Sequence, residues 1–191
     1  MKRNKREQGF SYIDVMIALV IMMVGILAMT GAVMANLVRS YDTDKQAIAK
    51  QLALSTIETV FSAKEIKKDD NSGLNVTPWD SIGNVGNNPV GGVPQGIFLN
   101  GFCPIREEEG ADGIFGTADD ACAAGAPCAG ANGTTNTSKV LSGYTRQIVI
   151  TDVPEGVNEA IKKRLVTVTV RYQVNGGSRQ ETMTTLVSLY Q

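Results

Sequence analysis

An acidic segment rich in glycine carries the residues best suited to bind a metal ion. It reads EEEGADGIFGTADD over residues 107–120 and includes Asp112, Asp119 and Asp120. Carboxylate oxygens on a flexible backbone are the ligands that Ca²⁺ prefers. The spacing differs from the EF-hand pattern, so two interpretations stay open: a Ca²⁺ site at these three aspartates, or a solvated acidic loop closed by a disulfide.

The chain has three cysteines, Cys103, Cys122 and Cys128. All three follow a long apolar run near the N-terminus, and they lie in an oxidising compartment if that run is an export signal or anchor. We therefore expect one disulfide and one remaining thiol. Cys122 with Cys128 and Cys103 with Cys122 are both open as pairings. Metal ligation by these cysteines is not expected, because no C-x-x-C pair and no histidine is present.

The composition argues against catalysis and against nucleic-acid binding. The chain has no histidine, the most common general base, and no nucleophile motif or paired catalytic constellation stands out. Its formal net charge of -1 provides no basic surface for a nucleic acid. The sequence therefore predicts a protein that is not an enzyme and that needs no cofactor other than the Ca²⁺ considered above.

Asp14 stands at the start of an apolar run that is long enough to cross a bilayer. Residues 15–35, VMIALVIMMVGILAMTGAVMA, contain no charge, and about 20 helical residues cover the ~30 Å hydrocarbon core. Basic residues are concentrated before the run: Lys2, Arg3, Lys5 and Arg6 precede it, and Arg39 follows it. This asymmetry predicts a cytoplasmic N-terminus. A carboxylate beside lipid is costly, so Asp14 is either a boundary residue or one with a charged partner.

The segment KREQGFSYIDVMIALVIMMVGILAM, residues 5–29, resembles the N-terminal signal and helix of type IV prepilins and type II secretion pseudopilins. The resemblance implies a leader cleaved between Gly9 and Phe10 by a prepilin peptidase, and N-methylation of Phe10. It also implies that Asp14 takes the place of the family's usual glutamate, which pairs with the N-terminal amine of a neighbouring subunit. Phe10 and Asp14 are then the assembly residues, since paired charges neutralise each other in a low dielectric.

Two other readings of the N-terminus stay open, a cleaved secretory signal and a simple membrane anchor. The small residues at 31–35 loosely fit a secretory cleavage site. Asp14 inside the apolar region argues against that signal.

The proline-free stretch after the leader predicts one long helix over residues 10–67. Residues 10–36 form its membrane or filament-core half, and residues 37–67 its amphipathic half. At 100° per residue the second half has two apolar stripes, one for its own sheet and one for neighbouring subunits. The stripes are Tyr41, Ile48 and Leu52 on one side, and Ala53, Leu54, Ile57, Val60 and Phe61 on the other.

The rest of the chain predicts a glycine-rich surface insertion over residues 68–143 and an antiparallel sheet over residues 144–191. Residues 95–99 are a strand candidate inside the insertion. In the sheet, residues 144–151, 165–174 and 180–190 read as strands, with Asn175-Gly176-Gly177 as a hairpin turn. The strand sequences YTRQIVITDVP, KRLVTVTVRYQVNGG and ETMTTLVSLY are similar to those of PilV-like minor pilins and related pseudopilins.

Together these features predict an α+β, type IV pilin-like fold. A long N-terminal helix packs on a C-terminal antiparallel sheet of three to four strands, with a long irregular loop between them. The sheet needs a cover on its apolar face, and the helix supplies it.

The favoured hypothesis is a structural subunit, a pilin or minor pilin, of a type IV pilus-like filament. Its expected partners are other pilin or pseudopilin subunits, the prepilin peptidase and methylase, and the bacterial inner membrane before assembly. The C-terminal domain is expected in the periplasm and then in an extracellular filament. Two alternatives stay open: a minor pseudopilin of a type II secretion system, and a membrane-anchored, Ca²⁺-dependent adhesin or binding module.

Overall fold

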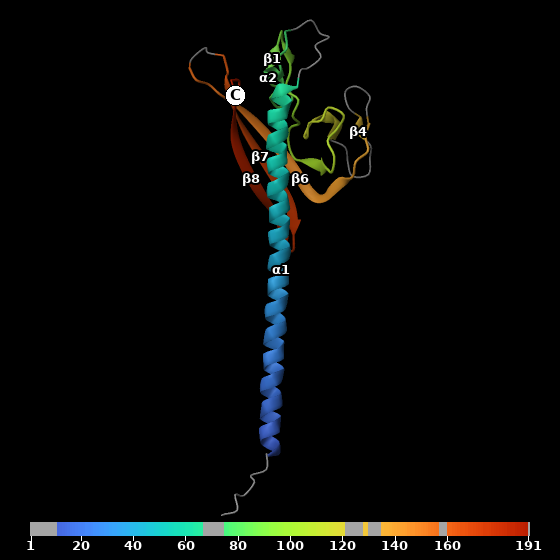
Figure 1. Ribbon diagram of the computed structural model, residues 1–191, viewed down its shortest axis with the longest axis vertical. Coiled ribbons are helices and arrows are strands. Elements are labelled where there is room, and N and C mark those ends of the chain that lie inside the picture. The colour runs from blue at the N-terminus through green and yellow to red at the C-terminus, as the bar shows by residue number, and fades with distance from the viewer. Residues whose placement is uncertain (1–10, 67–74, 121–127, 130–134, 157–159, 191) are drawn as a thin grey trace, which may run out of the picture. The chain divides into compact units, whose positions relative to one another are not determined.

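The computed structural model describes residues 11–66, 75–120, 128–129, 135–156 and 160–190 (Figure 1). The chain divides into two compact units, residues 1–43 and residues 44–191. The first contains the apolar part of the N-terminal helix. The second contains the rest of that helix, the sheet and the segment between them.

The N-terminal helix, α1, runs unbroken over Tyr12–Glu65, which is 54 residues. It confirms the predicted long helix. No proline occurs in it, Asp14 lies in its first turn and Lys64 lies in its last turn. These charges suit the helix dipole, whose positive end is at the N-terminus.

Four strands form one antiparallel sheet in the order β3-β6-β7-β8. The strands are β3 (Cys103–Arg106), β6 (Val140–Val153), β7 (Lys163–Val174) and β8 (Gly177–Ser188). The α+β class and the three long strands confirm the prediction. β3 was not predicted, because it lies in the segment predicted to be irregular. β6 begins at Val140, before the predicted start at residue 144.

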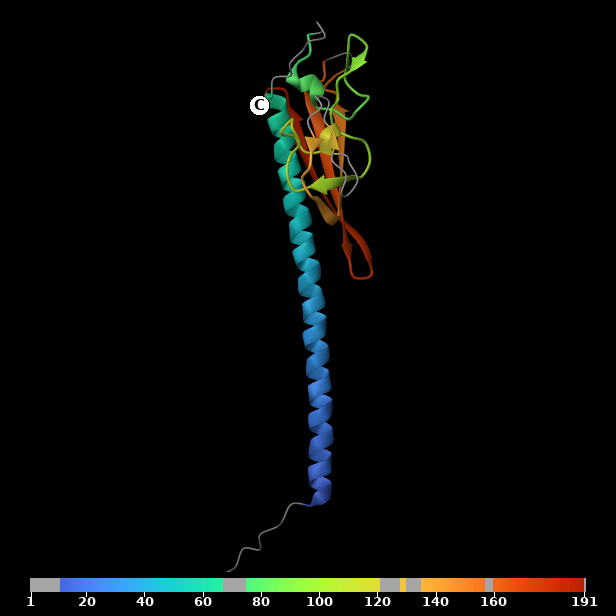
Figure 2. The ribbon, with the colours of Figure 1, turned by 90° about the vertical axis from the view of Figure 1, so that its right-hand side faces the viewer.

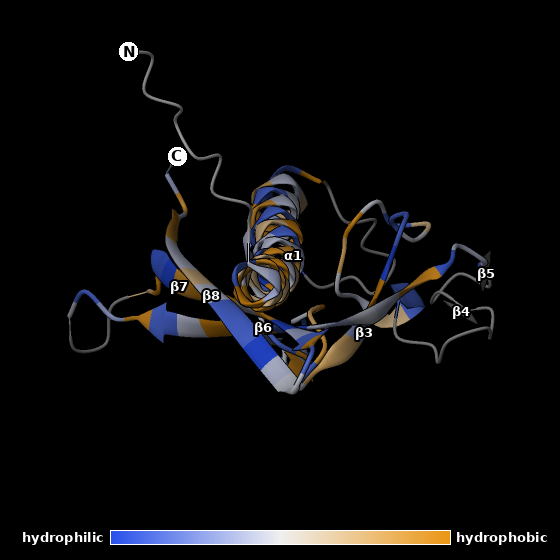
Figure 3. Ribbon diagram, turned by 90° about the horizontal axis from the view of Figure 1, so that it is seen from below, coloured by the Kyte–Doolittle hydropathy of each residue, from blue (hydrophilic) through white to orange (hydrophobic). Residues whose placement is uncertain are grey.

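The core lies between one face of the sheet and the part of α1 from residue 44 onward (Figure 3). In the register Ile148↔Val168↔Met183, even-numbered residues of β6 and β7 face the helix. The opposing face of α1 is made of small or short side chains: Ala49, Ala53, Thr56, Val60 and Ala63. Such residues let a helix approach a sheet closely, so the sheet supplies most of the bulk in the core.

This packing corrects the predicted stripes of α1. Ala53 and Val60 are buried as expected, but Leu54 of the same stripe is 47% exposed. On the other stripe, Leu52 packs against the core while Ile48 is exposed, so neither stripe is buried or exposed as a whole. The buried face is centred on Ala49, Ala53 and Val60, and the larger Leu52, Ile57 and Phe61 are partly buried against the core.

The segment between helix and sheet folds into short elements on the side of β6 (Figure 2). They are α2 (Pro78–Ser81), the β1–β2 pair (Pro89–Val90 and Val93–Pro94), the 3₁₀ turn η1 (Ala118–Asp120) and the β4–β5 pair (Cys128–Ala129 and Thr135–Asn136). The strand predicted over residues 95–99 is wrong. There, Phe98 makes an isolated bridge to Asn84, and its buried ring joins the core.

Candidate functional site

The part of α1 that belongs to the first unit presents a continuous apolar surface. Every large hydrophobic side chain from Val15 to Val38 is 47–72% exposed, and no charge occurs between Asp14 and Arg39. Exposed apolar area on this scale marks a surface that contacts lipid or other proteins. By length and composition, α1 is able to span a membrane, as the sequence predicted.

Asp14 caps the start of this helix. Its Oδ2 accepts a hydrogen bond of 3.3 Å from the main-chain N–H of Ser11, and the Asp14 N–H donates to the Ser11 oxygen at 3.0 Å. Serine followed three residues later by an acid is a form of the capping box. This local role was missed, although the spacing in the sequence could have indicated it. The other two predicted N-terminal residues, Gly9 and Phe10, lie outside the described residues.

The three aspartates predicted to bind Ca²⁺ hold the turn in which they lie. Asp112 Oδ1 accepts from the Ile114 N–H at 2.9 Å, and Asp119 Oδ1 accepts from the Thr117 hydroxyl at 2.6 Å. Asp120 Oδ2 accepts from the Gly116 N–H at 2.7 Å. In the described part of the chain, no group of three or more acidic, cysteine or histidine side chains is arranged to hold a metal ion. Ca²⁺ binding stays a prediction.

Arg146 on β6 is the counter-charge of this turn. Its Nη2 lies 3.9 Å from Asp120 Oδ2, and both side chains are 2% exposed. Its Nη1 donates to the Thr56 hydroxyl on α1 at 3.0 Å, and Phe115 lies against the guanidinium. Arg146 therefore connects three elements that are far apart in sequence. It was missed, although its place in the series Tyr144, Arg146, Ile148 puts it in phase with the buried side chains.

Burial governs the titration of this pair. It raises the pKa of Asp120 to about 6, opposed by the Gly116 N–H and by Arg146. It lowers the pKa of Arg146 to about 10, opposed by Asp120. Both charged forms are thus disfavoured by burial more than the pairing compensates, which is common for buried ion pairs.

Cys103 lies opposite Arg146 in the β3–β6 register, half-buried and with a free thiol. Burial raises the pKa of this thiol. Cys122 and the side chain of Cys128 are outside the described residues, so a disulfide between them stays a prediction.

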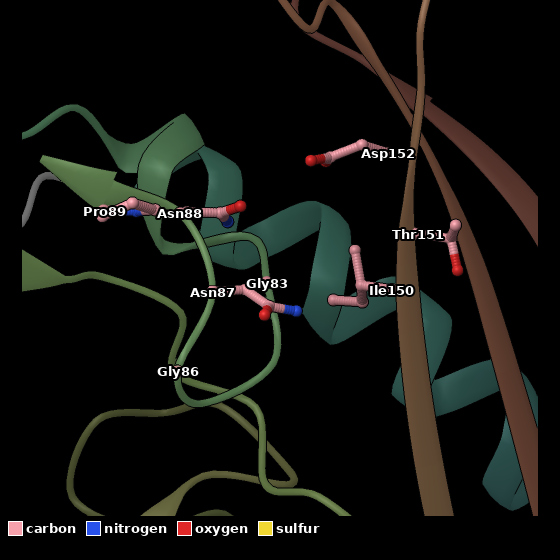
Figure 4. A pocket seen from close by; sticks show the side chains of 8 residues that line it. All are labelled: Gly83, Gly86, Asn87, Asn88, Pro89, Ile150, Thr151 and Asp152. Carbon is pink, nitrogen blue, oxygen red and sulfur yellow. The ribbon is translucent and has the colours of Figure 1, made fainter.

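A groove lies between the loop after α2 and the end of β6 (Figure 4). Its volume is about 340 Å³, and it is lined by Gly83, Gly86, Asn87, Asn88, Pro89, Ile150, Thr151 and Asp152. Arg164 of β7 anchors the loop. It donates to the main-chain oxygen of Ile82 at 2.8 Å and to Asp152 Oδ1 at 2.9 Å, and it stacks 4.4 Å from the Trp79 ring.

No family model, curated protein or solved structure matches this chain.

Proposed function

We propose that this chain is a prepilin-like subunit, a pilin or minor pilin, that assembles into a type IV pilus-like filament. The observation that carries the proposal is the exposed, uncharged apolar surface of α1 from Val15 to Val38. In water such a surface is unfavourable by about 25 cal/mol for each Å². In this proposal the apolar surface of α1 is covered by lipid before assembly and by the helices of other subunits afterwards.

The N-terminal residues supply the assembly step in this proposal. Cleavage between Gly9 and Phe10 creates a new amine four residues before Asp14. Asp14 is the single charge in residues 11–38 and lies exposed in the first turn of α1. In a bundle of apolar helices, its carboxylate and the methylated amine of a neighbouring Phe10 neutralise each other. An unpaired carboxylate there would be strongly unfavourable, so the pair also sets the axial position of one subunit against the next.

The basic residues before α1 place the N-terminus in the cytoplasm in this proposal, and the unit containing the sheet outside it. Before assembly the subunit is held in the inner membrane by α1. Its partners are then the prepilin peptidase and other subunits. The segment between α1 and β6 supplies the surface displayed on the filament.

The proposal is tested by N-terminal and intact-mass analysis of the protein from its native membrane and from sheared surface material. We expect a chain that begins at Phe10 and carries one added methyl group, present in both fractions. A processed chain confined to the membrane would favour a pseudopilin of a secretion system.

A chain that begins near residue 36 would mean a secretory signal and would contradict assembly through α1. An intact chain that begins at Met1 would indicate a simple membrane anchor. A Gly9→Leu variant is the matched control, because it blocks cleavage and leaves α1 unchanged.

A further inference from the structure

The outer edge of β6 is only partly covered by another strand. β3 pairs with β6 between Val140 and Arg146. Beyond Arg146, β6 continues to Val153 and pairs with β7 on its other side. The groove described above runs along this second half of β6 (Figure 4).

Asn84 shows which main-chain groups of β6 face that edge. Its side-chain Nδ2 donates to the Ile148 oxygen at 2.8 Å, and its Oδ1 accepts from the Ile150 N–H at 2.8 Å. The carboxamide thus binds the strand edge as a residue of a neighbouring strand would. Alternate residues of an antiparallel strand direct both main-chain groups to the same side. The oxygen of Ile150 and the N–H of Asp152 therefore face the groove.

These two groups form the next pairing position along the edge. Neither has a hydrogen-bond partner among the residues that the structure describes. Asn84 occupies the preceding pairing position, at the Ile148 oxygen and the Ile150 N–H. A residue bound at the Ile150 oxygen and the Asp152 N–H would therefore extend the hydrogen bonding along the strand edge that Asn84 begins.

The walls of the groove suit a polypeptide backbone. Gly86 leaves open space on the loop side, whereas the space beside Gly83 is filled by the Asn88 carboxamide. The Asn87 carboxamide points across the groove toward Ile150 (Figure 4). The Asp152 carboxylate points toward the loop, with one oxygen used by Arg164. Thr151 lies on the far side of the strand.

We propose that this groove binds an extended peptide segment of a partner protein by strand addition to Ile150 and Asp152. Main-chain pairing supplies the affinity in this mode of recognition, and side-chain pockets supply the selectivity. The second oxygen of Asp152 favours a basic or hydroxyl side chain on the bound residue beside it. A volume of about 340 Å³ holds a short segment only. The inference is independent of the filament role, because it uses no part of α1.

The test uses the ¹⁵N-labelled full chain in detergent micelles and a defined probe, the peptide acetyl-Thr-Thr-Lys-Thr-Thr-amide. We expect a saturable shift of the Asp152 amide resonance at peptide concentrations on the order of 5 mM. The matched probe is the same peptide with a methyl group on the main-chain nitrogen of its lysine. It keeps every side chain but removes one main-chain donor, so we expect about fivefold weaker binding.

Two variants separate groove binding from general contact with the protein. Asn87→Ala removes the carboxamide that crosses the groove and is expected to weaken binding about fivefold. The substitution keeps the main-chain oxygen of residue 87, which accepts from the Gln95 and Gly96 N–H groups at 3.1 Å, so we expect the loop to stay folded. Thr184→Ala, at an exposed position of β8 that does not line the groove, is the matched control and should bind as the unaltered chain does. Equal binding of the two peptides, or no saturable shift at Asp152, would overturn the proposal.

Discussion

The guanidinium of Arg146 and the carboxylate of Asp120 lie 3.9 Å apart in the interior, and each side chain is 2% exposed. The pair joins the acidic turn to β6, and the Thr56 hydroxyl extends it to α1. Asp120 also accepts from Asn136 Nδ2 at 3.2 Å. These hydrogen bonds and the ion pair thus connect the segment between α1 and β6 to the helix.

Replacing Arg146 with methionine should destabilise the folded domain by about 3 to 5 kcal/mol, because it leaves the Asp120 carboxylate buried without a counter-charge. Adding Asp120→Asn should restore much of the loss, since no uncompensated charge then remains. Chemical denaturation of the full chain in micelles measures the unfolding free energy of the single and the double variant. Arg171→Met on the exposed face of β7 is the control, with a change of about 1 kcal/mol or less. Additive effects of the two substitutions would show that the pair is not coupled.

The stability of the domain should depend on pH through Asp120. Burial raises its carboxyl pKa from 3.8 to about 6. Between these values the folded state binds more protons than the unfolded state. The contribution of Asp120 to the unfolding free energy is therefore fully present below pH 3.8 and is lost as pH rises past about 6.

The difference in unfolding free energy between the unaltered chain and Asp120→Asn isolates this contribution. We expect the difference to change by on the order of 2 kcal/mol between pH 4 and pH 7, in favour of the unaltered chain at pH 4. A difference that is flat over this range, or that changes in the opposite direction, would contradict a raised pKa.

Asn84→Ala should destabilise the domain by about 2 to 3 kcal/mol. It removes one donor and one acceptor from buried main-chain groups of Ile148 and Ile150, and each unmet group costs about 1 to 3 kcal/mol. Asn100→Ala is the matched control, because Asn100 is exposed and its carboxamide bonds the Val85 oxygen. Urea unfolding distinguishes the two. Equal midpoints would mean that Asn84 does not close the strand edge.

Asp14→Asn separates the two roles of Asp14. An asparagine oxygen still accepts from the Ser11 N–H, so the helix cap is kept, but the charge is lost. We expect normal leader cleavage and at least about a tenfold loss of protein from the sheared fraction, as for loss of one buried charge pair. Asp14→Glu should retain assembly. Normal amounts of the asparagine variant in the filament would mean that the cap, and not the charge, explains this residue.

Calcium should have little effect on stability. The oxygens of Asp112, Asp119 and Asp120 already accept from main-chain and side-chain groups, and Arg146 supplies a positive charge beside them. We therefore expect the same thermal midpoint, within about 1 °C, in millimolar CaCl₂ and in EDTA, since a ligand stabilises only the state that binds it. A rise in CaCl₂ that is lost in Asp119→Asn would establish the Ca²⁺ site instead.

Local pattern was sufficient for the regular elements. The uncharged run of residues 15–35 and the absence of proline predict α1, and the alternation around Val166, Val168 and Val170 predicts β7. Asn175-Gly176 predicts the hairpin that follows. Each of these signals lies within a short stretch of chain, where side-chain period and turn chemistry decide the backbone conformation.

The orientation of α1 was not predictable in the same way. Large side chains such as Leu54 suggested a buried stripe, but the sheet already fills the core with Ile148, Val168 and Val170. The helix face that fits against them is the one with Ala49 and Ala53. Which face is buried depends on the volume of the opposing surface, and that volume is known only once the sheet is formed.

The apolar helix, the acid at its start and the three long strands are predictable from the sequence, because they depend on residues that are neighbours in the chain. The tertiary structure alone decided that Arg146 meets Asp120 and Thr56, that β3 joins the sheet, and that Asn84 closes the edge of β6. These contacts join residues separated by 26 to 90 positions. The free energy of such a contact depends on burial and geometry at both ends, which no local pattern encodes.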